Sequence, residues 1–311
     1  MKRKPYRFFL FILLKLVYVI IIILPYKISV FLGTFFGSLA YAILTKYRNI
    51  TLNNLRLAFA GEKDEREIKR IARDVFRNLG RTAAECLSLR KFDREAVKRL
   101  IVEEDYRPLK EILSKGKGLI IIGSHYGNWE MSSIGGVAVG LDVTVIARRI
   151  YYPPYNKFLV TLREGKGVKT LYRDEKGVLR KSLNILKSNG VLGVVPDQDV
   201  DSIDGVFVNF FGKPAYTPTG PVVMAMLSGT PMLPTFMMRE NGRFRLFAGE
   251  PIYVENSGDK EQDIIRYTQK WSDIVEKYIR MYPSQWVWMH RRWKTRPGKE
   301  DFPRPARIVA G

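Results

Sequence analysis

A histidine and a glutamate five positions apart, His125 and Glu130, form the clearest candidate for acid–base chemistry in the sequence. A carboxylate bonded to one imidazole nitrogen fixes the tautomer that leaves the other nitrogen free as a base. This is the orienting arrangement of a hydrolase triad without its serine, so the hydroxyl of a second substrate would be the nucleophile. A histidine that follows a strand is also commonly structural, and the pair alone is a weak signal.

The spacing of this pair constrains the backbone between its members. Five steps along a continuous helix rotate a side chain by about 500°, which would place His125 and Glu130 on different faces. The aliphatic run at 119–122 has the pattern of a strand buried on both faces, and Gly127 permits a tight turn after it. We therefore expect a strand, a turn and a helix, with His125 and Glu130 meeting across the turn.

A second predicted strand, at 191–195, also ends in polar residues, Asp197 and Gln198. In an open α/β sheet the reactive crevice lies beyond the carboxyl ends of the strands. These two side chains could shape a substrate pocket there, although a capping or turn role explains them equally well.

The rest of the chain alternates predicted strands with predicted helices, which indicates an α/β layered domain. Thr217, followed by Pro218, is a plausible cap for one of these helices. Further strands are expected at 143–147, 232–238 and 244–248, and further helices at about 63–81, 154–164, 178–188 and 261–281.

The first fifty residues contain two 17-residue apolar runs, 8–24 and 28–44, with eight basic residues and no acidic one. At about 1.5 Å per residue each run reaches roughly 25 Å, the short end of what spans a bilayer. We expect residues 1–45 to be a membrane-anchoring segment, either a hairpin or a helix in the interface, and 46–311 to be the α/β domain with a basic aromatic tail. The second run could also pack against the body of the protein.

Composition narrows the possible partners. Lys and Arg number 52 against 31 acidic residues, a net charge of +21, which favours polyanions such as nucleic acid, anionic lipid, phosphorylated substrates or an acidic carrier protein. No nucleic-acid-binding module is recognisable, and the adjacent apolar runs favour lipid. One cysteine, Cys86, excludes an intramolecular disulfide, and two histidines without cysteine partners give no convincing zinc site. Without a Walker or dinucleotide glycine fingerprint, we expect neither metal nor cofactor.

Several ordered blocks resemble the bacterial lipid A biosynthesis acyltransferases, the late lauroyl and myristoyl transferases of the glycerolipid and lysophospholipid acyltransferase superfamily. The likeness covers nearly the whole chain. It is carried by His-x-x-x-x-Glu within Ser-His-Tyr-Gly-Asn-Trp-Glu and by the blocks at 48–59, 148–163, 196–199, 206–217 and 285–294.

This resemblance implies a mixed sheet flanked by helices and an enzyme that moves a fatty acyl group from an acyl carrier protein or coenzyme A thioester to a glycolipid hydroxyl. His125 would be the general base and Glu130 would orient it. Arg163 or backbone amides near the turn could stabilise the oxyanion. The expected substrate-binding residues are Asn128, Arg148, Arg149, Arg163, Asp197, Gln198 and Thr217, of which the arginines could equally be a solvated basic face.

The acceptor stays open at this point. A lipid A precursor, a mannosylated phosphoinositide and a lysophospholipid all fit the motif. A basic protein that binds an anionic membrane surface without catalysis is the alternative from another class. The expected location is the inner membrane, with the catalytic domain on its cytoplasmic face.

Overall fold

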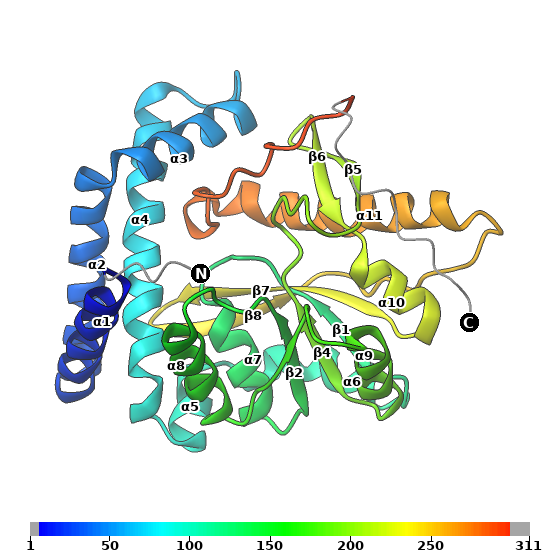
Figure 1. The fold of residues 1–311 in the computed structure, drawn as a ribbon, viewed down its shortest axis with the longest axis horizontal. Coiled ribbons are helices and arrows are strands. Elements are labelled where there is room, and N and C mark those ends of the chain that lie inside the picture. Colours follow the sequence, from blue (N-terminus) through cyan, green and yellow to red (C-terminus); the bar gives the residue numbers. More distant parts are fainter. Residues whose placement is uncertain (1–5, 299–311) are drawn as a thin grey trace.

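A six-stranded mixed sheet in the order β3-β2-β4-β1-β7-β8 forms the centre of the computed structural model, which describes residues 6–298 (Figure 1). The first five strands in this order run parallel, and β8 pairs antiparallel to β7. A separate two-stranded hairpin is formed by β5 and β6. The strands are β1 (Leu119–Ile122), β2 (Val143–Ala147), β3 (Lys169–Tyr172), β4 (Val191–Val194), β5 (Gly205–Phe210), β6 (Lys213–Pro218), β7 (Met232–Glu240) and β8 (Arg243–Ala248).

Helices cover both faces of the sheet, which is why its central strands are continuously aliphatic. Alternate residues of β1 enter different cores. Ile120 and Ile122 join a cluster with α10 (Gly220–Ser228) and α11 (Lys260–Met281), whereas Leu119 and Ile121 join a cluster with α7 (Trp129–Ala138). The helices of the body are α3 (Thr45–Ala58), α4 (Glu65–Ser88), α5 (Arg94–Leu100), α6 (Arg107–Leu113), α7 (Trp129–Ala138), α8 (Pro153–Glu164), α9 (Val178–Lys187), α10 (Gly220–Ser228) and α11 (Lys260–Met281). The predicted α/β class with a helix-flanked mixed sheet is confirmed.

The strands predicted at 119–122 and 143–147 have the expected bounds, and the other three differ by one or two residues. The expectation for Thr217 is wrong. Pairing in the hairpin continues through Thr217 to Pro218, so Thr217 lies in β6, and α10 begins at Gly220 after Thr219 with a proline in its first turn. The sequence predicts neither β3 nor the hairpin of β5 and β6.

The two apolar runs form helices α1 (Tyr6–Ile23) and α2 (Tyr26–Ile43), which lie beside the body at the left of Figure 1. Both are long and apolar enough to cross a membrane, and most of their surface is uncovered. Exposed side chains along them are Phe8, Phe9, Leu13, Leu16, Val19, Ile20, Ile23, Phe31, Phe35, Phe36, Leu39 and Ile43. A patch of this kind on a monomer marks an interaction surface.

α1 and α2 together form an apolar helical hairpin, which packs on two helices of the body. α2 crosses α4 where Gly33 and Gly37 meet Gly80, so closely that a Cβ on Gly80 would lie 2.1 Å from the Gly33 carbonyl oxygen. α1 contacts α8 through rings, with Tyr18 and Phe158 centroids 5.1 Å apart. The basic residues at 2–4 and the end of the predicted tail, from 299 onward, lie outside the described residues.

Candidate active site

The carboxyl ends of β1 and β4 carry the central pair of the site, His125 and Asp197. The two strands are parallel neighbours with Ile122 opposite Val194, so the segments that follow them emerge side by side. His125 Nδ1 lies 2.7 Å from Asp197 Oδ1, and the His125 backbone N–H donates to Asp197 Oδ2 at 2.7 Å. The carboxylate that contacts the imidazole is therefore Asp197.

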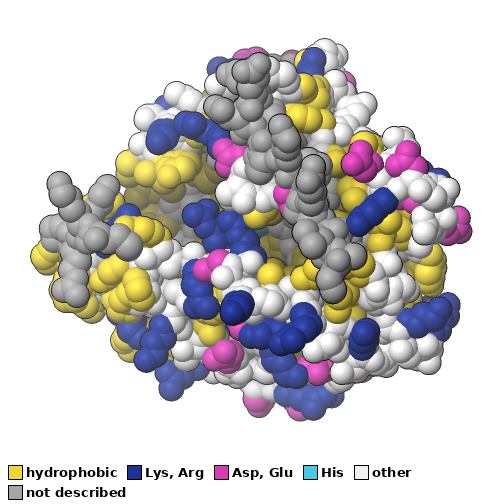
Figure 2. Space-filling model, turned by 45° about the vertical axis from the view of Figure 1, so that its right-hand side comes forward, with side chains coloured by type: hydrophobic (Ala, Val, Ile, Leu, Met, Phe, Trp, Pro, Cys, Tyr) yellow, Lys and Arg dark blue, Asp and Glu magenta, His cyan; other side chains and the backbone are white. Residues whose placement is uncertain are grey.

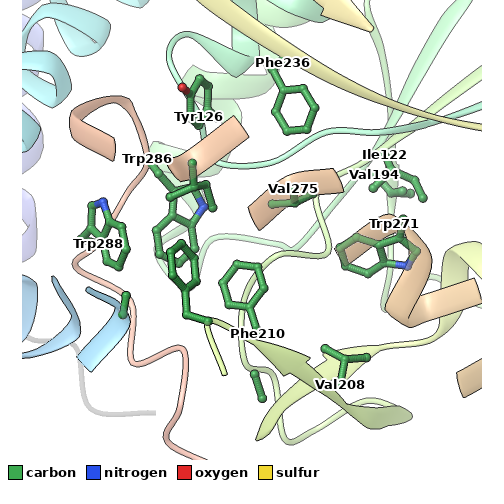
Figure 3. Close-up of a cluster of buried hydrophobic side chains, with 14 of the residues drawn as sticks. Ile122, Tyr126, Val194, Val208, Phe210, Phe236, Trp271, Val275, Trp286 and Trp288 are labelled. Atoms are coloured by element: carbon green, nitrogen blue, oxygen red, sulfur yellow. The ribbon is translucent and has the colours of Figure 1, made fainter. Parts of the chain in front are cut away.

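Asp197 is held ionised in a buried position. It is 1% exposed, and the Trp286 indole N–H also donates to its Oδ2 at 2.8 Å. Burial by itself raises the pKa of Asp197, but the charge of a protonated His125 and the three hydrogen bonds outweigh it and lower the pKa to about 2. Trp286 is fixed in turn by the aromatic cluster of Figure 3, where its ring lies beside those of Phe210 and Trp288.

The turn after His125 is fixed by the chain that crosses it. Gly127 has a φ of +57°, and a Cβ at this position would lie 1.8 Å from the carbonyl oxygen of Met237. Gly127 N–H donates to the Gln285 carbonyl at 2.8 Å and Asn128 N–H to the Met237 carbonyl at 3.1 Å. The backbone amides of 125–128 all have acceptors within the protein, so the expectation that amides of this turn bind the oxyanion is not supported.

Asn128 has a structural position in place of the expected substrate contact. Its Oδ1 caps α7 by accepting from Met131 N–H at 3.0 Å, and its Nδ2 donates to Glu85 at 2.8 Å. Glu85 lies near the end of α4 and also binds Arg239 of β7 with a shortest distance of 2.5 Å. Because Asn128 is 1% exposed and both ends of its amide are bonded, it braces the turn against α4.

Glu130 does not contact His125. The predicted turn is present, but Glu130 lies in the first turn of α7 and forms a bidentate ion pair with Arg163, at 2.5 and 2.7 Å. Both side chains are largely buried. Burial lowers the pKa of Arg163, but its bonds to Glu130 raise it by more, so it stays charged. The expectation that Glu130 orients His125 is corrected, because Asp197 occupies that position and Glu130 is committed to Arg163.

A second histidine, His290, completes the immediate surroundings of His125. The two rings have centroids 5.2 Å apart, and the amide nitrogen of Gln198 lies 2.7 Å from His290 Nε2. His290 follows α11 in an irregular segment, and no sequence pattern connects it with His125. Burial, and then the charge of a protonated His125, lower the pKa of His290 to about 4, so it is neutral at neutral pH.

A cavity opens beside the turn, between α7 and the sheet. The space between protein atoms there is about 790 Å³, counting its open mouth. Polar groups lie near the turn: Glu130, Arg163 and Ser124, whose buried hydroxyl has no hydrogen-bond partner within the described residues. The opposite end is apolar and is lined by Tyr106, Leu109, Leu141, Val143 and Val191. Gly123, directly after β1, and Gly193 of β4 contribute no side chain to its wall.

The remaining predicted residues fall into two groups. Arg148 and Arg149 follow β2 on the surface, where Arg149 stacks on Tyr172 at 3.7 Å and pairs with Asp174 at 3.3 Å. Basic side chains gather near the middle of the face in Figure 2. Thr217 is fully buried and accepts from Arg292 at 2.6 Å, so a direct substrate contact is not supported for it.

The chain also matches proteins of known class. The profile of the bacterial lipid A biosynthesis acyltransferases matches residues 2–295. The chain belongs to this family. A lipid A biosynthesis palmitoleoyltransferase of Escherichia coli (strain K12) is 30% identical over 286 residues, with 89% of each chain covered. A lauroyltransferase of lipid A biosynthesis from the same organism is 27% identical over 287 residues, again with 89% of each chain covered.

A more distant relative has a different acceptor in its name. A phosphatidylinositol mannoside acyltransferase of Mycobacterium tuberculosis (strain CDC 1551 / Oshkosh) is 28% identical over 187 residues, 60% of this chain and 57% of the relative. The family identifies the protein as an acyltransferase of lipid A biosynthesis type, and it supports acyl transfer to a glycolipid.

Proposed function

We propose that the protein transfers a fatty acyl group from an acyl carrier protein or coenzyme A thioester to a hydroxyl of a lipid A precursor-like glycolipid, with His125 as general base and Asp197 as the group that orients it. The observation that carries this proposal is the 2.7 Å contact between His125 Nδ1 and a buried, ionised Asp197. With Nδ1–H donating to the carboxylate, Nε2 is the nitrogen that can accept a proton.

The proton transfers of the reaction then involve only the two substrates and His125, which Asp197 orients. Nε2 of His125 takes the proton of the acceptor hydroxyl as its oxygen attacks the thioester carbonyl. The tetrahedral intermediate collapses with cleavage of the C–S bond, and the imidazolium returns the proton to the departing thiolate. Positioned base catalysis of this kind contributes about 10² to 10⁴ in rate.

The cavity beside the turn suits the acyl chain. Its polar lining residues, Ser124, Glu130 and Arg163, lie near the turn that follows His125, and the rest of its lining is mainly apolar. A chain inserted there would place the thioester carbonyl near Ser124 and Arg163, which are the donors we propose for the oxyanion in place of the turn amides. In this mechanism Glu130 acts on Arg163, by holding its guanidinium in the polar part of the cavity lining.

We further propose that α1 and α2 anchor the protein in an anionic inner membrane with the catalytic domain on the cytoplasmic face. The exposed apolar surface of the hairpin supports attachment, and the flanking basic residues favour that side. Arg148 and Arg149 follow β2 on the surface and suit acceptor phosphates or an acidic carrier.

The test is an acyl-transfer assay with purified protein in detergent. Radiolabelled acyl carrier thioester and acyl-coenzyme A are each offered with a lipid A precursor, a mannosylated phosphoinositide and a lysophospholipid. We expect transfer to the lipid A precursor and a loss of at least about 10²-fold in folded His125→Ala. Equal transfer by His125→Ala and the wild type would refute the mechanism. Binding to anionic vesicles without turnover on any acceptor would favour a non-catalytic membrane protein.

A further inference from the structure

The sequence has only two histidines, and the fold brings both to the same place. His125 follows β1, His290 lies in the segment after α11, and their ring centroids are 5.2 Å apart. The side chain between them is Gln198, which comes from the turn that also carries Asp197. One strand end therefore supplies two successive residues that contact the proposed base.

The Gln198 amide lies over the face of the His125 ring. Its nitrogen is 3.1 Å from Nδ1 and 3.0 Å from Nε2. The Nδ1–H bond and the Nε2 lone pair diverge in the ring plane, so one atom cannot bond to both nitrogens in that plane. A position nearly equidistant from both is above the ring. Asp197 meets the same ring at its edge, through Nδ1.

The far side of the Gln198 amide is held by His290. The amide nitrogen and His290 Nε2 are 2.7 Å apart, which makes Nε2 the acceptor and leaves the ring proton on Nδ1. His290 is in turn fixed by Asn54 of α3, whose Nδ2 donates to the carbonyls of His290 at 2.6 Å and of Trp288 at 2.8 Å. A chain of contacts thus runs from α3 to the base.

We propose that His290 is a positioning residue for acyl transfer, which acts through Gln198 to hold the plane of the His125 imidazole. The proposal rests on the function proposed for His125. An edge contact with Asp197 alone permits the ring to tilt about the Nδ1···Oδ1 direction, and tilting swings Nε2 away from the acceptor hydroxyl. The amide above the ring opposes that tilt, and Trp129 packs on the ring at a centroid distance of 5.2 Å.

The neutral state of His290 is part of this arrangement. A charged His290 would have no acceptor for the Gln198 amide and would repel the imidazolium that forms during transfer. Its burial and the adjacent His125 keep it neutral. We call the contact of His290 with Gln198, and of Gln198 with the His125 ring, the clamp. Small misplacements of a reacting group cost on the order of 10²-fold in rate, so loss of the clamp should lower kcat while leaving KM nearly unchanged.

The first experiment compares His290→Phe, His290→Gln, Gln198→Leu and the double variant His290→Phe/Gln198→Leu in the acyl-transfer assay. We expect a 10- to 100-fold fall in kcat for His290→Phe, with KM within about twofold. His290→Gln presents an oxygen near the Nε2 position and should recover most of the rate. Met289→Ala, a neighbour in the same segment, is the matched control and should retain it.

The double variant separates positioning from independent effects. If His290 acts only through Gln198, the double variant is no slower than Gln198→Leu alone. Multiplicative losses would overturn the proposal, as would a kcat for His290→Phe within twofold of the wild type. A loss shared by Met289→Ala would assign the effect to the folding of the segment and overturn it too.

A second measurement does not depend on turnover. Because the chain has two histidines, ¹⁵N-histidine labelling yields two ring systems in an NMR spectrum. We assign the His290 ring by its absence from His290→Phe and expect it to be neutral with its proton on Nδ1, and we expect the His125 signals to change in Gln198→Leu. A His290 that is charged at neutral pH or protonated on Nε2 would overturn the clamp. Absence of transfer in the wild type would count against the proposed function. The His290 tautomer would then still show whether the clamp exists.

Discussion

Replacement of Asp197 by asparagine tests the central contact of the site. The two carboxylate oxygens of Asp197 have different partners: Oδ2 accepts from the His125 backbone N–H and from the Trp286 indole, and Oδ1 faces His125 Nδ1. An amide at this position must keep its oxygen toward the two donors. Its NH₂ group then faces Nδ1 of His125 and donates to it.

The consequence of this geometry is a reversed tautomer. With Nδ1 accepting, the ring proton moves to Nε2, and the nitrogen that should receive the acceptor proton is blocked. We expect Asp197→Asn to reduce kcat by about 10³- to 10⁴-fold, which corresponds to about 4 to 5.5 kcal/mol of transition-state stabilisation. KM should change little, since Asp197 is buried behind the imidazole.

The substitution also removes a pH-dependent contribution to stability. The pKa of Asp197 is about 2 in the folded protein and 3.8 for an ordinary aspartate, which corresponds to about 2 kcal/mol. Because the folded value is the lower one, this stabilisation is fully present above pH 4 and is lost as the pH falls toward 2. Thermal unfolding of both proteins across this range in detergent should show the difference shrinking with acidification.

The control is Glu130→Gln, which changes a carboxylate to an amide in the neighbouring helix without touching His125. Acyl transfer is measured for both variants at saturating donor. A kcat for Asp197→Asn within tenfold of the wild type would refute the assignment. So would a larger loss of kcat for Glu130→Gln than for Asp197→Asn, because that would return the orienting role to Glu130.

Other residues of the site give three further predictions. Glu130→Gln leaves Arg163 buried without its charge partner and should lower the free energy of unfolding by about 2 to 4 kcal/mol, part of which a Glu130→Gln/Arg163→Met double variant recovers in chemical denaturation. Gly193→Ala adds a methyl group to the cavity wall, so kcat/KM for the best donor should fall about tenfold or more relative to kcat/KM for a donor with a shorter acyl chain. The control is Gly220→Ala, whose Cβ meets no atom within 4 Å and which should leave the chain-length profile unchanged. Ser124→Ala removes a buried hydroxyl without a hydrogen-bond partner in the described chain, so the melting temperature should not fall, while kcat/KM drops at least about tenfold if that hydroxyl binds the oxyanion.

Strand ends were the part of the site that the sequence could locate. The aliphatic runs before His125 and before Asp197 were both recognisable, because a parallel strand covered on two faces has no polar alternation. Sequence position did not show that β4 lies directly beside β1, with β2 and β3 on its other side. That strand order brings together His125 and Asp197, which are 72 positions apart. Because the order cannot be read from the sequence, the local spacing predicts the nearby Glu130 as the orienting carboxylate.

Two other features depend on contacts that have no local signature. His290 lies in an irregular segment whose position is fixed by the burial of Trp286 and Trp288 and by Asn54, far away in sequence. Thr217 precedes a proline, as a helix cap often does, but the hairpin pairing of β5 with β6 extends past it and delays the helix to Gly220. For Thr217, tertiary pairing overrides the local pattern.

Two helices, α4 and α8, contact both the apolar helices α1 and α2 and the residues that position the active-site turn. α2 packs on α4, and α4 carries Glu85, which braces Asn128 at the start of α7. α1 packs on α8, and α8 carries Arg163, which forms the ion pair with Glu130 in the first turn of α7. Both helices that would face the bilayer therefore rest on elements that position the turn after His125. With the hairpin in a membrane, as we propose, the hydroxyl of an amphiphilic acceptor can reach Nε2 while its hydrocarbon stays among the lipids. Through α4 and α8, the most apolar segment of the chain is thus connected to the turn that follows the proposed base.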